Sequence, residues 1–181
     1  MITEIQSLTS PSAIDLLKSY KDKSFIMMLL CEQSYNEYSF IKNFINVPLI
    51  LVNTAMTALN SIVVNADDMK IPNILLNSTT GVIIGLISSF KIYEKIQSFH
   101  QLQCKFNKLS SSIESKMINT DNITDEDIRN VIDTYDNLID NIDYPISEKI
   151  KARIKKQFIE KVQLPSILSV DFVVCNDKCC V

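Results

Sequence analysis

Two long stretches without any charged side chain constrain this chain more than any other feature. They run from Asn43 to Ala66 and from Ile71 to Phe90, which is 24 and 20 residues. About 20 helical residues at roughly 1.5 Å each match a hydrocarbon core of about 30 Å. The pattern therefore predicts a membrane hairpin, in which two helices cross a bilayer and the acidic segment Ala66–Met69 forms the turn between them.

The charges at the ends of the two runs predict the orientation of this hairpin. The segment between the runs holds two aspartates and one lysine, whereas the outer flanks carry Lys42, Lys91, Lys95, Lys105 and Lys108. Lysines on the outer flanks favour a cytoplasmic location for both termini. The polar segment Met1–Ser12 lacks the basic and apolar parts of a signal peptide, so we expect insertion to depend on the hairpin itself.

Composition and periodicity predict an all-α protein of a single domain. Only 2 glycines and 5 prolines occur in 181 residues, which leaves few residues for the tight turns of a sheet. A net charge of −3 gives no general reason to expect nucleic acid as a partner. The expected regions are an N-terminal helical region (1–42), the membrane hairpin (43–90), a long post-membrane helix (91–118), a two-helix amphipathic region (123–164) and a tail (165–181).

The regions after the hairpin have the patterns of amphipathic helices. Apolar residues recur at steps of three and four between Ile92 and Ile113, which draws one stripe along a helix. This stripe predicts packing against another segment of the chain or a coiled coil with a second copy. Thr124, followed by three acidic residues, is typical of a capped helix start.

A basic helix is expected from Ser147 to Val162, with cations around an apolar stripe. These cations either contact anionic lipid or form a solvated face that balances the preceding acidic helix. The candidate lipid-facing residues are Lys149, Lys151, Arg153, Lys155 and Lys156.

Polar and small residues lie at helical spacing within the two uncharged runs. An amide in lipid without a partner is costly, and small residues allow two helices to approach closely. These residues therefore predict packing between the two spans, the lining of a polar pore formed by several hairpins, or the centre of a soluble helical bundle. They are Asn46, Asn53, Thr57, Asn60, Asn73, Asn77, Thr80, Gly81, Gly85 and Ser88.

No pattern in the sequence indicates an enzyme, a metal site or a cofactor. The single histidine, His100, has no nucleophile motif around it, and no phosphate-binding glycine loop occurs. Five scattered cysteines favour a reducing compartment. Cys175, Cys179 and Cys180 are candidates for palmitoylation or soft-metal binding, although they match neither a CaaX box nor a paired zinc motif.

Four segments together resemble the SLATT-type two-transmembrane domains, and more closely the versions carried by nucleocytoplasmic large DNA viruses. The resemblance covers roughly residues 20–168 and rests on SYNEYSFIKNF, INVPLI, IPNILLNSTTG and NIDYPISEKIKARIKKQFIEKVQLPSIL. It implies a membrane protein whose bacterial relatives are predicted to form pores in conflict systems switched by nucleotide signals. Those systems place a sensor or nucleotide-generating partner beside the domain, and no sensor module is found in this sequence, which is an argument against the effector role. The expected partners are membrane lipid, further copies of the chain and a viral or signalling protein.

The leading hypothesis is a non-enzymatic, two-span membrane protein that self-associates through its spans. Its expected role is a viral-type membrane component or a pore-forming effector, in a host or virion membrane. The alternative is a soluble or capsid-associated helical interaction protein in which the hairpin is buried in a bundle. Solubility without detergent distinguishes the two hypotheses.

Overall fold

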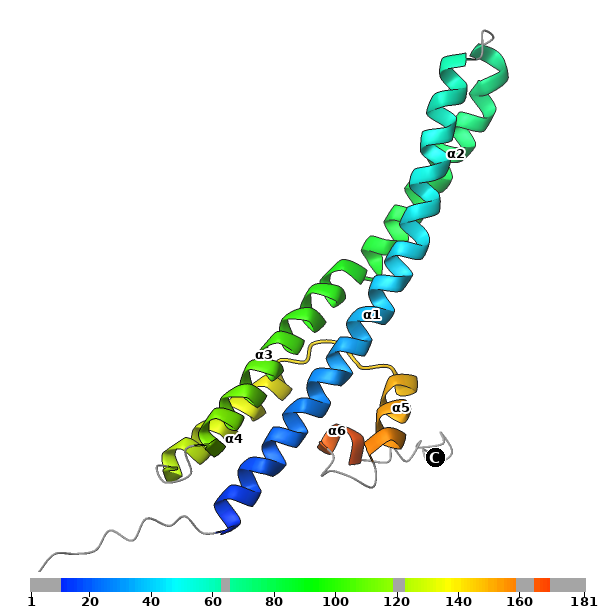
Figure 1. Ribbon diagram of the computed structural model, residues 1–181. Coiled ribbons are helices and arrows are strands. Elements are labelled where there is room, and N and C mark those ends of the chain that lie inside the picture. Colours follow the sequence, from blue (N-terminus) through cyan, green and yellow to red (C-terminus); the bar gives the residue numbers. More distant parts are fainter. Residues whose placement is uncertain (1–10, 63–65, 119–122, 159–164, 170–181) are drawn as a thin grey trace, which may run out of the picture. The chain divides into compact units, whose positions relative to one another are not determined.

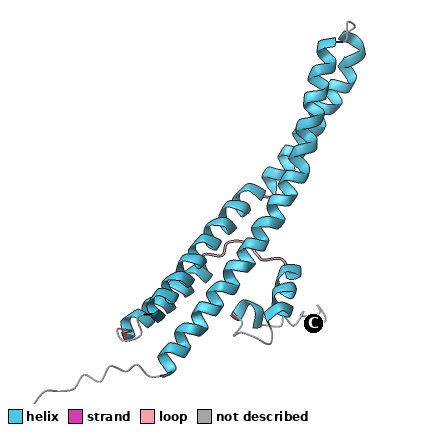
Figure 2. Ribbon diagram, in the orientation of Figure 1, coloured by secondary structure: helices cyan, strands magenta, loops and turns pink. Residues whose placement is uncertain are grey.

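The protein is almost entirely helical in a computed structural model that describes residues 11–62, 66–118, 123–158 and 165–169. Every regular element in these ranges is a helix (Figure 2), which confirms the predicted all-α class. The helices are α1 (Pro11–Ile62), α2 (Ala66–Ser89), α3 (Ile92–Ile118), α4 (Asp125–Asp140), α5 (Glu148–Phe158) and α6 (Ser166–Ser169) (Figure 1). The three C-terminal cysteines lie outside the described residues.

The chain divides into two compact units. Unit 1 consists of Met1–Glu32 and Gln101–Val181, and unit 2 consists of Gln33–His100. Unit 1 therefore contains the first part of α1, the last part of α3, and α4 to α6. Unit 2 contains the rest of α1 and α3 together with α2.

Unit 1 holds a conventional apolar core. Apolar side chains from all of its helices are buried, including Ile26 and Met27 of α1 and Phe106 and Ile113 of α3. The ring of Tyr135 on α4 has edge contacts with Tyr20 and Phe106, at centroid distances of 5.3 and 6.1 Å. Aromatic rings favour this edge-to-face geometry, so Tyr135 connects α4 to both α1 and α3.

The start of α4 is fixed by a capping box, as the sequence indicates. The backbone N–H of Asp127 donates to the Thr124 hydroxyl, and the Asp127 carboxylate accepts from the Thr124 backbone N–H at 3.2 Å. Lys116 of α3 also donates to this carboxylate. Together, the hydrogen bonds from Lys116 and Thr124 lower the pKa of Asp127 to about 2.

Unit 2 is built around the helical hairpin, which corresponds to the two uncharged runs. Helix α1 continues through Pro48 and α2 through Pro72. The prediction that Ala66–Met69 forms a turn is wrong, because these residues are the first turn of α2. Acidic residues are common in the first turn of a helix as well as in turns, so the sequence pattern alone does not distinguish the two.

The junction between α2 and α3 is short and has a left-handed residue. Lys91 has a φ of 51°, and its N–H donates to the Ser88 carbonyl at 2.9 Å. A residue in this conformation commonly ends a helix. The Lys91 carbonyl then accepts from the Lys95 N–H at 3.0 Å, so α3 begins directly after the junction.

The apolar stripe of α3 is buried within the single chain. Phe99 and Ile92 are buried in unit 2, whereas Leu102, Phe106 and Ile113 are buried in unit 1. Of the two arrangements that the stripe predicts, the structure therefore has the packing against other segments of the same chain. A second copy has little of this stripe left to contact.

Candidate membrane interface

The hairpin exposes its apolar side chains on both helices. Phe44 of α1 is 70% exposed, and Ile71 of α2 is 76% exposed. The most apolar stretch of α1 has no residue buried inside the chain. In the most apolar stretch of Lys70–Ile118, 6% of the residues are buried. Both segments are long and apolar enough to cross a membrane. The exposed set comprises Phe44, Val47, Ile50, Leu51, Val52, Leu59, Ile71, Ile74, Leu75, Val82, Ile84, Leu86 and Phe90.

Two asparagines of α1 form side-chain hydrogen bonds with a neighbouring helix of unit 2, one with α2 and one with α3. Asn60 of α1 and Asn73 of α2 form a reciprocal amide pair, with both N–O distances at 3.0 Å. At the other end of unit 2, the Asn46 amide donates to the Tyr93 hydroxyl at 3.0 Å. The hairpin thus turns these amides towards its partner helix and its apolar side chains outwards. Amides that pair in this way avoid the cost of an unpaired polar group in an apolar medium.

Aromatic rings and lysines form a band at the open end of the hairpin. The Lys42 ammonium lies 5.9 Å from the Tyr93 ring centroid, and that of Lys95 lies 5.3 Å from the Tyr38 centroid. Tyr38 also stacks on Phe99 at 5.9 Å. Tyrosine rings and lysines with long apolar stems are typical of the boundary between lipid and water.

The apolar and aromatic residues of Phe25–Phe40 around Glu32 and Glu37 indicate a helix at or near the interface, and Tyr38 lies in it. The pairing with Tyr93 and the lysines was not predicted, because the lysines were considered only as topology signals. Tyr38 and Tyr93 each lie within a few residues of the end of a run and next to a lysine in sequence or on the helix. That neighbourhood was the signal that could have identified them.

Other predicted residues of the hairpin form no hydrogen bond across α1 and α2 among the described residues, although Thr80 lines an apolar pocket with residues of α1. Thr57 donates to the Asn53 carbonyl of its own helix at 2.9 Å. Gly81 and Gly85 face open space, since a Cβ built on either glycine meets nothing within 4 Å. Asn77 and Ser88 are exposed, and the Thr80 hydroxyl is buried without a hydrogen-bond partner among the described residues.

The candidate basic helix lies in unit 1 as α5. Its apolar residues Ile150 and Ile154 are buried in the core of that unit. Lys151 forms an ion pair with Glu148 at 2.8 Å, and Lys155 is half-buried. The other three candidates, Lys149, Arg153 and Lys156, are exposed.

Reactive groups are sparse among the described residues. Burial raises the pKa of the Cys31 thiol to about 12, so this cysteine stays protonated and unreactive at neutral pH. The exposed ring of His100 contacts the Tyr35 ring at a centroid distance of 5.3 Å. In the same described part of the chain, no three His, Cys, Asp or Glu residues come together as a metal site.

The fold and site define an all-α protein with two helices able to cross a membrane. Comparison with protein-family models, curated proteins and solved structures gives no match. The similarity to SLATT-type domains therefore stays an expectation from the sequence.

The Asn60–Asn73 pair gives a direct test of how the two hairpin helices are held together. We expect Asn73→Leu alone to destabilise the hairpin by about 1 kcal/mol, because it leaves the Asn60 amide unpaired. The double variant Asn60→Leu with Asn73→Leu removes both amides and recovers most of this loss. The measurement is a double-mutant cycle on unfolding in mixed micelles, and additive losses would show that the two amides do not interact.

Proposed function

We propose that this chain is an integral membrane protein whose unit 2 hairpin spans the bilayer. The observation that carries the proposal is the arrangement of side chains on the hairpin, with paired amides between the helices and large apolar residues outside. A contiguous exposed apolar surface of this kind is typical of contact with lipid or another protein. In a soluble helical bundle, by contrast, large apolar residues are buried between the helices and polar residues face outwards.

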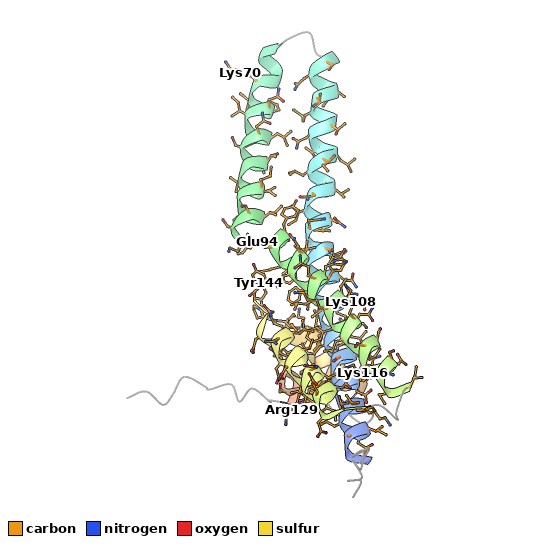
Figure 3. The ribbon with its side chains drawn as sticks, turned by 90° about the vertical axis from the view of Figure 1, so that its left-hand side faces the viewer. Lys70, Glu94, Lys108, Lys116, Arg129 and Tyr144 are labelled. Atoms are coloured by element: carbon orange, nitrogen blue, oxygen red, sulfur yellow. The ribbon has the colours of Figure 1, made fainter. Side chains whose placement is uncertain are left out.

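The lengths of the exposed surfaces support this proposal. The exposed apolar residues extend from Ile71 of α2 to Phe90, directly after the end of this helix, and about 20 helical residues span about 30 Å, the thickness of a hydrocarbon core. The aromatic and lysine band then lies at the cytoplasmic boundary, with both termini on that side. Lys70, at the start of α2 (Figure 3), lies on the opposite side of the membrane.

Carbonate extraction combined with thiol labelling tests the proposal. The five cysteines are first replaced, with alanine at Cys31 because that side chain is fully buried. A single thiol is then introduced by Lys70→Cys, or by Ser111→Cys as the matched exposed site on α3. We expect the protein to remain in the membrane pellet after carbonate extraction. An impermeant maleimide should label the Lys70→Cys thiol only from the non-cytoplasmic side. It should label the Ser111→Cys thiol only from the cytoplasmic side.

Either of two results would reject the spanning hairpin. Release into the carbonate supernatant would favour the soluble interaction protein, in which a partner covers the exposed apolar surface. Labelling of both thiols from the same side would place the hairpin on the membrane rather than across it.

We infer in addition that copies of the hairpin associate through the open face of α2. Asn77, Gly81 and Gly85 lie at steps of four on this face, where none of the described residues lies within 4 Å of a Cβ built on either glycine. A second helix can approach closely at such a face and accept or donate a hydrogen bond at the exposed amide. Association of this kind is the arrangement that a SLATT-like pore requires.

Energy transfer between labelled copies in liposomes tests this association, and release of a trapped small-ion indicator tests the pore. We expect Gly81→Leu with Gly85→Leu to weaken association by roughly tenfold, because the added side chains hold the backbones apart. The pair Ile74→Leu with Leu86→Ile is the control, since it changes exposed residues at constant volume. Unchanged transfer in the glycine variant would reject this face, and intact liposomes with associated wild-type protein would reject the pore.

A further inference from the structure

A groove of about 480 Å³ lies between α3 and α4 in unit 1. Its floor is apolar and consists of Leu109, Val131 and Leu138, and its rim is polar. Small-molecule sites in proteins commonly have this volume and this combination of an apolar floor with a few polar groups. The rim residues are Lys105, Lys108, Ser112, Lys116, Asn130 and Thr134.

Two lysines on the rim form no ion pair with any residue that the structure describes. Lys105 and Lys108 lie three residues apart, on the same side of α3, where like charges repel. The ion pairs found in the described part of the chain involve neither of them. Lys116, labelled with Lys108 in Figure 3, is instead paired with Asp127. The groove therefore carries two uncompensated positive charges at one end.

None of the acidic residues of α4 lines the groove. Helix α4 is strongly acidic, yet it contributes Asn130, Val131, Thr134 and Leu138 to the lining. Its acidic residues are at the other positions of the helix, namely Asp125, Glu126, Asp127, Asp133, Asp136 and Asp140. The lining itself is thus neutral on the α4 side and positive on the α3 side, which favours an anion.

We propose that this groove binds a small organic phosphate. Lysine ammonium groups bind phosphate as point charges, and Lys105 and Lys108 provide two of them side by side. The Ser112 hydroxyl and the Asn130 amide are further donors on the rim. The Thr134 hydroxyl is not, because it already donates to the Asn130 carbonyl at 2.6 Å.

The apolar floor of the groove indicates which kind of organic group the phosphate carries. Leu109, Val131 and Leu138 offer an apolar surface to the carbon body of the ligand. No aromatic side chain lines the groove, so a nucleobase has nothing to stack on. The ligand class is therefore a phosphate ester with a compact apolar body. This site is in unit 1, and its test does not depend on whether the hairpin spans a membrane.

Lysine footprinting on the full chain in phosphatidylcholine nanodiscs tests the proposal. The probes are phenyl phosphate, inorganic phosphate and benzyl alcohol, and mass spectrometry measures the acetylation rate of each lysine. We expect millimolar phenyl phosphate to slow acetylation of Lys105 and Lys108 by about tenfold, inorganic phosphate to protect less, and benzyl alcohol not to protect. Lys149 and Lys156 on α5 are the internal controls, because they are exposed and should keep their rates.

Calorimetric titration with phenyl phosphate gives a second, independent measurement. Lys105→Gln with Lys108→Gln should raise the Kd by about tenfold or more. The pair Lys149→Gln with Lys156→Gln removes the same charge from the same unit and should leave the Kd unchanged. Both variants change exposed side chains, so the fold is retained.

Three outcomes would overturn the proposal. Equal protection by inorganic phosphate and phenyl phosphate would reduce the groove to a counterion site. Equal protection of Lys149 and Lys156, or an equal rise in Kd in both variants, would show binding to charge alone. Protection of Lys105 and Lys108 by nanodiscs of anionic lipid, without protection by phenyl phosphate, would identify a membrane surface as the occupant.

Discussion

Val82→Lys is expected to prevent stable insertion of the hairpin. Val82 is 63% exposed and lies near the middle of the uncharged run of α2, at the centre of the bilayer if the hairpin spans it. A lysine at the centre of a transmembrane helix costs about 2.5 to 3.5 kcal/mol on insertion scales. This corresponds to roughly a hundredfold shift towards the uninserted form. The measurement is the fraction of protein that resists carbonate extraction.

Phe90→Lys is the matched control for this substitution. Phe90 is 62% exposed, so the two variants place the same charge on equally exposed positions. Phe90 lies at the end of the same run, where a lysine side chain reaches the lipid headgroups. We therefore expect this variant to insert normally. Equal extraction of both variants would contradict the membrane hairpin, because a soluble protein tolerates an exposed lysine equally well at either position.

The sequence predicts the longer helices of this protein well because they have local signals, whereas the short helix α6 lies in the segment predicted only as a tail. The Thr124 capping box marks the start of α4, and the stripe from Ile92 to Ile113 marks the buried face of α3. Such signals depend on residues within one or two turns of each other. The predicted turn at Ala66–Met69 was wrong because acidic residues such as Asp67 and Asp68 are as typical of a helix start as of a turn.

The sequence could not predict which residues of different helices meet. Periodicity places Asn60 and Asn73 each on a polar face, but it does not set the register between the two helices. The partner of Asn46 is Tyr93 on α3 rather than an amide of α2, and no spacing rule indicates this. The groove of unit 1 was missed for a similar reason, because Lys105 and Lys108 resemble an ordinary solvated face until α4 is placed beside them.

Phe106→Ala is expected to release α4 from unit 1. The Phe106 ring is fully buried, and it contacts Tyr135, which in turn contacts Tyr20 on α1. Truncation of a buried phenylalanine costs about 3 to 5 kcal/mol, from lost apolar contacts and the cavity that remains. The measurement is hydrogen exchange of the α4 amides in the full chain, which should become about a hundredfold faster.

Ile118→Ala is the control for Phe106→Ala, because Ile118 is on the same helix and 77% exposed. Its truncation should change stability by no more than about 0.5 kcal/mol.

Since α4 forms one wall of the groove, Phe106→Ala should also abolish protection of Lys105 and Lys108 by phenyl phosphate while carbonate resistance persists. If Phe106→Ala removed both the protection of these lysines from acetylation and the resistance to carbonate, insertion of the hairpin would depend on the core of unit 1. If the α4 amides of Phe106→Ala still exchanged as slowly as in the wild-type protein, Tyr135 and its neighbours would hold α4 in place without Phe106.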